Sequence, residues 1–271
     1  KSVERYRHLG SVLTDMMNTV SRFCMQSDID KDYILRLGAD PSRVVVTGNT
    51  KFDQTYTDVS QEQKNKLISE MGLVGSGPVI LAGSTHKGEE EIIFRSFIAI
   101  KEAFPKAKLV IAPREILRTD EIINLAASHN FTAARRTALQ QNPSAGHDVV
   151  ILDTIGELGK IYSLGDIVFV GGSLIQHGGH NILEPAAHGK PIIVGPNMFN
   201  FKDSYFLFSN RGACVTVRDS TELTEQTLKI LNNNEIRKAM SDETTAIINE
   251  NRGAARKSAV YLKELLEAFK Y

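Results

Sequence analysis

Short runs of β-branched and aromatic residues alternate along the chain with amphipathic stretches of helical spacing. Each run is about four residues long, as expected for strands that are covered on both faces. The predicted strands are Phe23–Gln26, Val44–Thr47, Val79–Ala82, Leu109–Ala112, Val149–Leu152, Ile167–Val170, Ile192–Val194 and Cys214–Val217. Between them, Gly88–Phe104 and Leu117–Ser128 predict helices. Such alternation is typical of βαβ units, so the predicted fold class is α/β with a doubly wound parallel sheet.

The strands divide unevenly along the 271 residues. Residues 1–50 hold two of them, which is too few for a complete domain. Residues 51–250 hold the other six, enough for one doubly wound domain. Residues 251–271 predict a terminal helix whose leucines share one face. Because the first residue is Lys1 and not Met, we expect the sequence to belong to a longer protein.

Charge and cysteine content narrow the possible functions. Lys and Arg together number 32, and Asp and Glu also number 32, so nothing indicates a nucleic-acid partner. Cys24 and Cys214 lie in apolar stretches, which predicts two buried free thiols. The chain has no apolar run near the length of about 18 residues that a membrane-spanning helix needs.

Ligands of doubly wound sheets bind beyond the carboxyl ends of the strands, so the segments that follow the strands are the candidates. Gly83–Gly88 is a short turn before a helix, and Ser84 and Thr85 in it could either help to bind an anion or cap the helix. Arg114 follows Pro113 at a strand end. Its guanidinium could bind a phosphate, or it could form a surface ion pair with Glu115.

The glycine-rich segment Gly171–Pro185 carries the strongest signal. Its glycines allow the backbone to approach a ligand closely. Asn181 and Glu184 have the spacing of a helix-capping pair, and the Glu184 carboxylate could equally bind a sugar diol. The histidines of this segment fall short of the four convergent ligands of a zinc site, so no metal is expected. The segment also lacks the G-x-G-x-x-G fingerprint of a dinucleotide site.

Several motifs resemble one family, the 3-deoxy-D-manno-octulosonic acid (Kdo) transferases. They are FVGGSLIQHGGHNILEPAAHGKPIIVGP, AGSTHKGEEE, IAPRE, DTIGELGKIYSLGD and GNTKFDQ, with an opening KSVERYRHL that is similar to the end of the family's first domain. The resemblance implies an inverting GT-B glycosyltransferase with two Rossmann-like domains. Residues 1–50 would be the C-terminal remnant of the N-terminal acceptor domain, and residues 51–250 the nucleotide-sugar donor domain. Residues 251–271 would be a terminal helix packing back toward the N-terminal domain.

The resemblance also implies a reaction: transfer of Kdo from CMP-Kdo to a lipid A precursor at the cytoplasmic face of the bacterial inner membrane, in lipopolysaccharide biosynthesis. It implies neither a cofactor nor a metal. The donor-binding residues would be Pro113 and Arg114 at the CMP phosphate, Ile155, Gly156 and Glu157 at the cytidine, Asn181, Ile182, Leu183 and Glu184 at the phosphate and ribose, and Ser84 and Thr85 at the Kdo carboxylate.

The family's membrane anchor and catalytic glutamate, the general base, lie in a segment with no counterpart in this sequence. We therefore expect no catalytic residue in these 271 residues, which would be soluble, with membrane association through the missing part. Two alternatives stay open. One is a GT-B-like nucleotide-sugar epimerase, which would bind UDP rather than CMP. The other is a CMP-binding module that is inactive in isolation.

Overall fold

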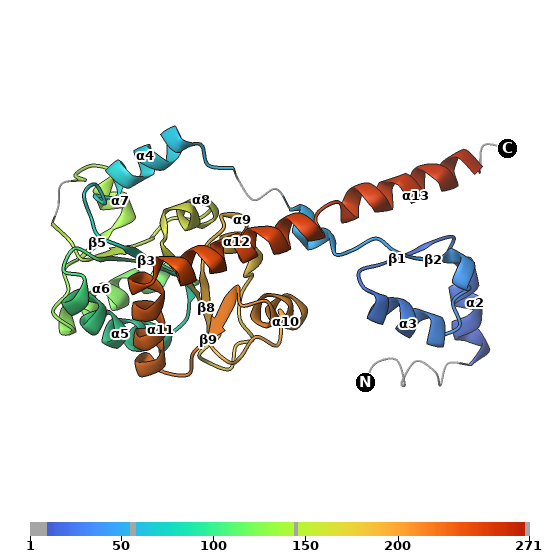
Figure 1. Ribbon diagram of the computed structural model, residues 1–271, viewed down its shortest axis with the longest axis horizontal. Helices are drawn as coiled ribbons and strands as arrows, with labels where there is room; N and C mark the ends of the chain where they lie inside the picture. Colours follow the sequence, from blue (N-terminus) through green and yellow to red (C-terminus); the bar gives the residue numbers. More distant parts are fainter. Residues whose placement is uncertain (1–9, 55–57, 144–145, 269–271) are drawn as a thin grey trace. The chain divides into compact units, whose positions relative to one another are not determined.

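The computed structural model describes residues 10–54, 58–143 and 146–268. The chain divides into two compact units (Figure 1). The smaller consists of Lys1–Thr55 and Ile248–Tyr271, and the larger of Tyr56–Ile247. The opening motif KSVERYRHL and the last three residues of the predicted terminal helix lie outside the described residues.

The larger unit is built on a seven-stranded sheet in the order β5-β6-β4-β3-β7-β8-β9, in which every neighbouring pair is parallel. The strands are β3 (Val79–Thr85), β4 (Lys108–Pro113), β5 (Ala133–Arg135), β6 (Val149–Ile151), β7 (Ile167–Val170), β8 (Ile192–Val194) and β9 (Cys214–Thr216). The strand order reverses between β3 and β7, which makes this a doubly wound sheet. The predicted α/β fold class is confirmed.

Helices cover both faces of this sheet (Figure 1). On one face, Phe94 and Phe97 of α5 pack with alternate strand residues such as Ile111 and Phe169, all at most 1% exposed. The helices of the unit are α4 (Gln61–Glu70), α5 (Glu89–Ala103), α6 (Thr119–Ser128), α7 (Arg136–Leu139), α8 (Leu158–Ile161), α9 (Leu183–Ala187), α10 (Lys202–Asn210) and α11 (Ser220–Asn232), with 3-10 turns η4 (Ile116–Arg118) and η5 (Tyr162–Leu164). The next helix, α12 (Asn234–Asn251), contains the boundary between the units.

The smaller unit contains two parallel strands, β1 (Phe23–Met25) and β2 (Val44–Val46). Its helices are α2 (Ser11–Thr19), α3 (Asp28–Arg36) and α13 (Ala254–Ala268), with 3-10 turns η2 (Pro41–Arg43) and η3 (Thr50–Asp53). The Asp53 carboxylate accepts hydrogen bonds from the N–H groups of Gly253 and Ala255, so it caps the start of α13. Residues from the two ends of the chain thus meet in this unit.

The expectations for Cys24 and for one strand differ from the structure, whereas the expected burial of Cys214 is confirmed. The predicted burial of Cys24 is wrong: its side chain is exposed, because β1 alternates in burial along its three residues. Cys214 is buried, and burial raises the pKa of its thiol to about 12. The edge strand β5 was not predicted, because Ala133, Ala134 and Arg135 carry no β-branched signal.

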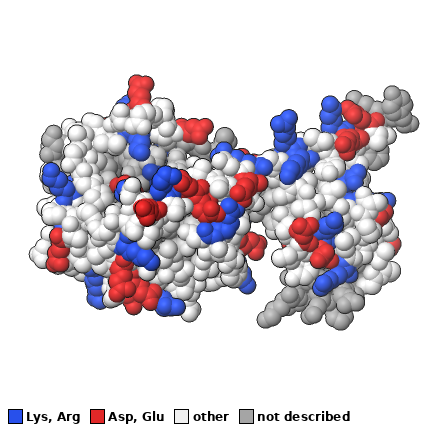
Figure 2. Space-filling model, viewed as in Figure 1, with Lys and Arg blue, Asp and Glu red and all other residues white. Residues whose placement is uncertain are grey.

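The surface and the helices add two observations. Basic and acidic side chains are interspersed over the face seen in Figure 2, in keeping with the balanced charge of the sequence. Within the described ranges, no helix combines the length and the apolar character that crossing a bilayer requires.

Candidate functional site

The end of β3 and the loop that follows β7 meet at the carboxyl edge of the sheet, where the strand order reverses. The Gly171 N–H donates to the Gly83 carbonyl oxygen at 2.8 Å. A Cβ atom on Gly171 would lie only 2.4 Å from the Ser84 carbonyl oxygen, so this approach requires glycine. Ser84 itself has a φ of +56°, a left-handed conformation that costs a non-glycine residue energy. Such strain is common at ligand sites.

One buried carboxylate joins these two loops. Glu89, the first residue of α5, is 0% exposed. Its Oε2 accepts hydrogen bonds from the N–H groups of His86 (2.9 Å) and Gly172 (2.7 Å). Its Oε1 accepts from those of Ser173 (3.0 Å) and Leu174 (2.9 Å). Burial raises the pKa of Glu89, and these four donors oppose the rise. We expected the backbone N–H groups of this segment to bind an anion. The N–H group of His86 instead donates to a carboxylate of the protein itself.

Ser84 and Thr85, which we expected in a turn, are instead the last two residues of β3, because the strand continues past Ala82. Their side chains lie in different environments. The Thr85 side chain is fully buried and its hydroxyl donates to Glu90 Oε1 at 2.9 Å, while Arg118 donates to both oxygens of Glu90. Ser84 is partly exposed. The alternative that one of them caps α5 is wrong, because the N-cap is Gly88, which makes no side-chain hydrogen bond. Of the two side chains, only that of Ser84 is accessible to a ligand.

Arg114 lies on the exposed surface immediately beyond β4, after the buried Pro113. Its N–H donates to the Thr85 carbonyl oxygen at 2.9 Å, which fixes its backbone against the β3 loop. Among the described residues, its guanidinium makes no hydrogen bond or ion pair, so the expected alternative of a pair with Glu115 is not found there. Five N–H donors with positive charge are thus available at the carboxyl edge.

The Arg114 charge acts on groups of the glycine-rich segment. Burial lowers the pKa of His180 to about 4, and the charges of His86 and Arg114 add to this effect. Burial raises the pKa of Glu184, while a hydrogen bond from Asn181 and the charge of Arg114 oppose the rise. Arg114, His180 and Glu184 therefore belong to one electrostatic neighbourhood, although they come from two different loops.

The segment from Asn181 to Glu184 forms the entry to α9. Asn181 Oδ1 accepts from the Leu183 N–H at 3.1 Å, and its Nδ2 donates to Glu184 Oε1 at 3.3 Å. These bonds orient both polar side chains and leave one oxygen of Glu184 for a ligand. The predicted cap with Asn181 as the N-cap residue is wrong, because the N-cap of α9 is Ile182 and no side chain caps this helix. Ile182 and Leu183 are at most 1% exposed, so they support the polar side chains on either side of them and are themselves covered.

The loop after β6 carries the other predicted contacts. Ile155 is 84% exposed, which is unusual for a large apolar side chain, and Gly156 has a φ of +88°. Glu157 accepts a hydrogen bond from Thr154 and lies 3.5 Å from the guanidinium of Arg136. Arg136 is buried and was not singled out from the sequence. It fixes the position of Glu157, and a buried arginine outside any motif leaves no signal in a single sequence.

Three histidines converge beside Arg114. His86 comes from the β3 loop, and His177 and His180 come from the glycine-rich segment. Sequence reasoning considered the latter two and missed His86, because 94 positions separate it from His180. A pair of loops that meets only in the folded sheet brings the three rings together.

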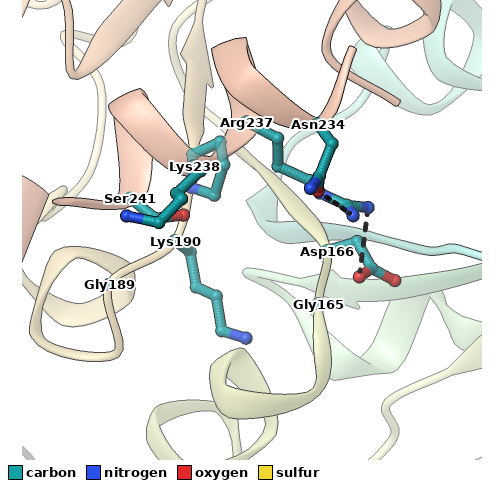
Figure 3. A pocket seen from close by; sticks show the side chains of 9 residues that line it. Gly165, Asp166, Gly189, Lys190, Asn234, Arg237, Lys238 and Ser241 are labelled. Atoms are coloured by element: carbon teal, nitrogen blue, oxygen red, sulfur yellow. Dashed lines mark hydrogen bonds and ion pairs between the residues drawn. The ribbon is translucent and has the colours of Figure 1, made fainter. Parts of the chain in front are cut away.

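A hollow of about 330 Å³ lies at the opposite edge of the sheet, before β7 and β8 (Figure 3). Lys190 points into it, and Arg237 from α12 forms a 3.9 Å ion pair with Asp166. Burial lowers the pKa of Lys190 to about 8, and the charge of Lys64 adds to this. None of the predicted donor-binding residues lines this hollow.

Comparison with known proteins agrees with the sheet and its polar edge. The chain is 28% identical to the C-terminal CMP-Kdo binding domain of WaaA from Acinetobacter baumannii, with a TM-score of 0.63 over 69% of this chain and 96% of that domain. A putative UDP-N-acetylglucosamine 2-epimerase from Listeria monocytogenes is 16% identical, with a TM-score of 0.61 over 93% of this chain and 61% of its own, which reflects a shared fold. The sheet and these similarities place the chain in the GT-B fold class.

The sequence comparisons are more specific. The family model described as 3-Deoxy-D-manno-octulosonic-acid transferase (kdotransferase) matches residues 1–54. The 3-deoxy-D-manno-octulosonic acid transferase of Haemophilus influenzae is 32% identical over 269 residues, 98% of this chain. The chain spans 62% of the length of that relative. Over nearly its whole length the chain is therefore similar to the Kdo transferases.

Proposed function

We propose that the chain is part of a Kdo transferase and that its larger unit binds CMP-Kdo at the carboxyl edge of the sheet. The observation that carries the proposal is Arg114, a cation without a partner among the described residues at the strand-order reversal. CMP-Kdo carries two anionic groups, a phosphodiester and a carboxylate, and a guanidinium can donate two parallel hydrogen bonds to either. The domain from Acinetobacter baumannii, whose description names CMP-Kdo binding, supports the assignment.

Within this proposal each loop has a role. Arg114, beside Pro113, binds the phosphate, and Ser84 lies near the Kdo carboxylate. The buried Thr85 contributes indirectly, because its carbonyl oxygen accepts the Arg114 N–H and fixes that backbone. Asn181 and Glu184, supported by the buried Ile182 and Leu183, face the phosphate and the ribose. Ile155, Gly156 and Glu157 cover the cytidine. As the phosphate departs it gains negative charge, so Arg114 stabilises the transition state more than the ground state.

The remaining assignments follow from the family. We propose that the acceptor is a lipid A precursor and that transfer takes place at the cytoplasmic face of the bacterial inner membrane. We also propose that residues 51–250 are the donor domain and that residues 1–50 and 251–271 belong with the acceptor domain. The 3.1 Å hydrogen bond from the Ser258 hydroxyl to the Thr47 hydroxyl supports the pairing of these two end segments.

The test is calorimetric titration with CMP, cytidine and UDP. Hydrogen bonds to charged groups contribute about 1.5–3 kcal/mol, so Arg114→Ala should weaken CMP binding about tenfold to a hundredfold and leave cytidine binding nearly unchanged. Arg95→Ala, which removes an exposed arginine paired with Glu91 on α5, is the matched control and should change neither. Equal losses for CMP and cytidine would make Arg114 structural. Tighter binding of UDP than of CMP would favour the epimerase alternative.

A further inference from the structure

We propose that His86, His177 and His180 form a binding site for a divalent transition-metal ion of the Zn²⁺ class. In the part of the chain that the structure describes, they are the one group of three histidine, cysteine or acidic side chains whose ligand atoms converge. These atoms all lie within 4.8 Å of one another. The Nε2 atoms of His86 and His180 are 2.8 Å apart. The ring centroids of His86 and His177 are 3.9 Å apart.

These separations suit a metal centre. A Zn–N bond of about 2.0–2.1 Å and tetrahedral angles place ligand nitrogens about 3.3 Å from one another. The observed separations, from 2.8 Å up to 4.8 Å, bracket this value, so small side-chain rotations bring all three nitrogens into position. The hydrogen bond between His86 and His180 occupies one nitrogen of each ring, and an ion would replace the shared proton.

The backbone holds the three residues in place before any ion arrives. Glu89 accepts from the N–H groups of His86 and Gly172, which ties the loop of the first histidine to the loop of the other two. A Cβ atom on Gly172 would lie 3.0 Å from the His180 ring and 3.3 Å from the His177 ring, so both rings pack directly over this glycine. The site is preorganised, which lowers the entropy lost on binding.

The donor set selects the class of ion. Three imidazoles suit Zn²⁺, Co²⁺, Ni²⁺ and Cu²⁺, whereas Mg²⁺ and Ca²⁺ require oxygen ligands, and no carboxylate belongs to the group. His177 is exposed, so an ion can enter from solvent and a fourth ligand can bind. Three protein ligands with an open fourth position are the arrangement of sites that bind an exchangeable water or anion.

The test is titration of the untagged, EDTA-treated chain with Co²⁺, followed by the visible absorption of tetrahedral cobalt, with Zn²⁺ as competitor. We expect one ion per chain. Loss of a residue that only orients a ligand weakens metal binding 10–100-fold, so His177→Ala and His180→Ala should each weaken it by more than about a hundredfold. His129→Ala is the matched control and should bind as the unaltered chain does, because His129 contacts Glu91 elsewhere in the same unit. Circular dichroism checks that each variant folds. If His180→Ala does not fold, His177→Ala still provides the test, because His177 is exposed and its loss should not disturb the fold.

Two results would overturn the proposal: no tetrahedral cobalt spectrum at millimolar Co²⁺, or unchanged affinity in a folded His177→Ala variant. A CMP titration of the zinc-loaded chain adds a separate readout that rests on the proposed function. If the metal site and the proposed CMP site are both correct, the ion adds positive charge beside Arg114 and CMP binding tightens. Zinc binding without any effect on CMP would leave the metal site standing and count against the placement of the phosphate.

Discussion

Glu89→Gln tests whether one buried carboxylate holds the site together. Glutamine has a single carbonyl oxygen, so it can keep at most two of the four backbone hydrogen bonds that Glu89 accepts, and its NH₂ group would face the other two donors. Two bonds to a charged acceptor contribute about 3–6 kcal/mol in total. The lower cost of burying a neutral group offsets part of this loss. We therefore expect a net destabilisation of about 3 kcal/mol.

The assay is urea denaturation followed by circular dichroism, together with thermal melting. For a unit of this size, about 3 kcal/mol corresponds to a decrease in Tm of about 6–12 °C. Glu121→Gln is the matched control, because that carboxylate is 46% exposed and its partner Arg118 keeps Glu90. The control should change stability by less than about 1 kcal/mol. If Glu89→Gln unfolds within about 1 kcal/mol of the unaltered chain, the loops do not depend on this carboxylate and the reasoning is refuted.

Two further variants test the remaining electrostatics. Glu184→Gln should change the free energy of unfolding by less than about 1 kcal/mol, because glutamine can still accept the Asn181 hydrogen bond. It should weaken CMP binding by more than fivefold, roughly 1 kcal/mol. A lower Tm with unchanged CMP affinity would leave Glu184 only a structural role beside Asn181. Lys190 has a folded pKa of about 8 against 10.5 when exposed, so the unfolded chain binds more protons between these values and stability should rise with pH across that window. Lys190→Met should flatten the rise and stabilise the chain at pH 7 by up to about 3 kcal/mol, whereas Lys238→Met, at an exposed lysine of the same hollow, should do neither.

The sequence predicted those parts of the fold that local chemistry determines. Runs such as Ile167–Val170 are strands with the predicted bounds, because four consecutive apolar residues suit a strand that is covered on both faces. β5 was missed because its alanines have no such preference, and its pairing with β6 depends on the neighbouring strand. Cys24 was misplaced because an apolar stretch does not reveal which of its residues face solvent.

The candidate site was predictable as a set of loops and not as a set of contacts. Every predicted segment lies at or just beyond the end of a strand of one parallel sheet, so its location at the carboxyl edge could be inferred. The environment of Thr85 could not be inferred, because nothing in the sequence distinguishes its hydrogen-bond partner Glu90 from other helix residues. The same holds for Glu89, which accepts hydrogen bonds from backbone N–H groups of a loop more than 80 positions away. The meeting of His86 with His180 is likewise a property of the strand order.

The most direct test of the central claim is a crystal structure of this chain with CMP. We predict electron density for the nucleotide at the carboxyl edge of the sheet, with a phosphate oxygen within about 3 Å of the Arg114 guanidinium and the base beside Ile155. Nucleotide density in the hollow lined by Lys190 at the opposite edge, or at the carboxyl edge with Arg114 turned away from the phosphate, would contradict the account.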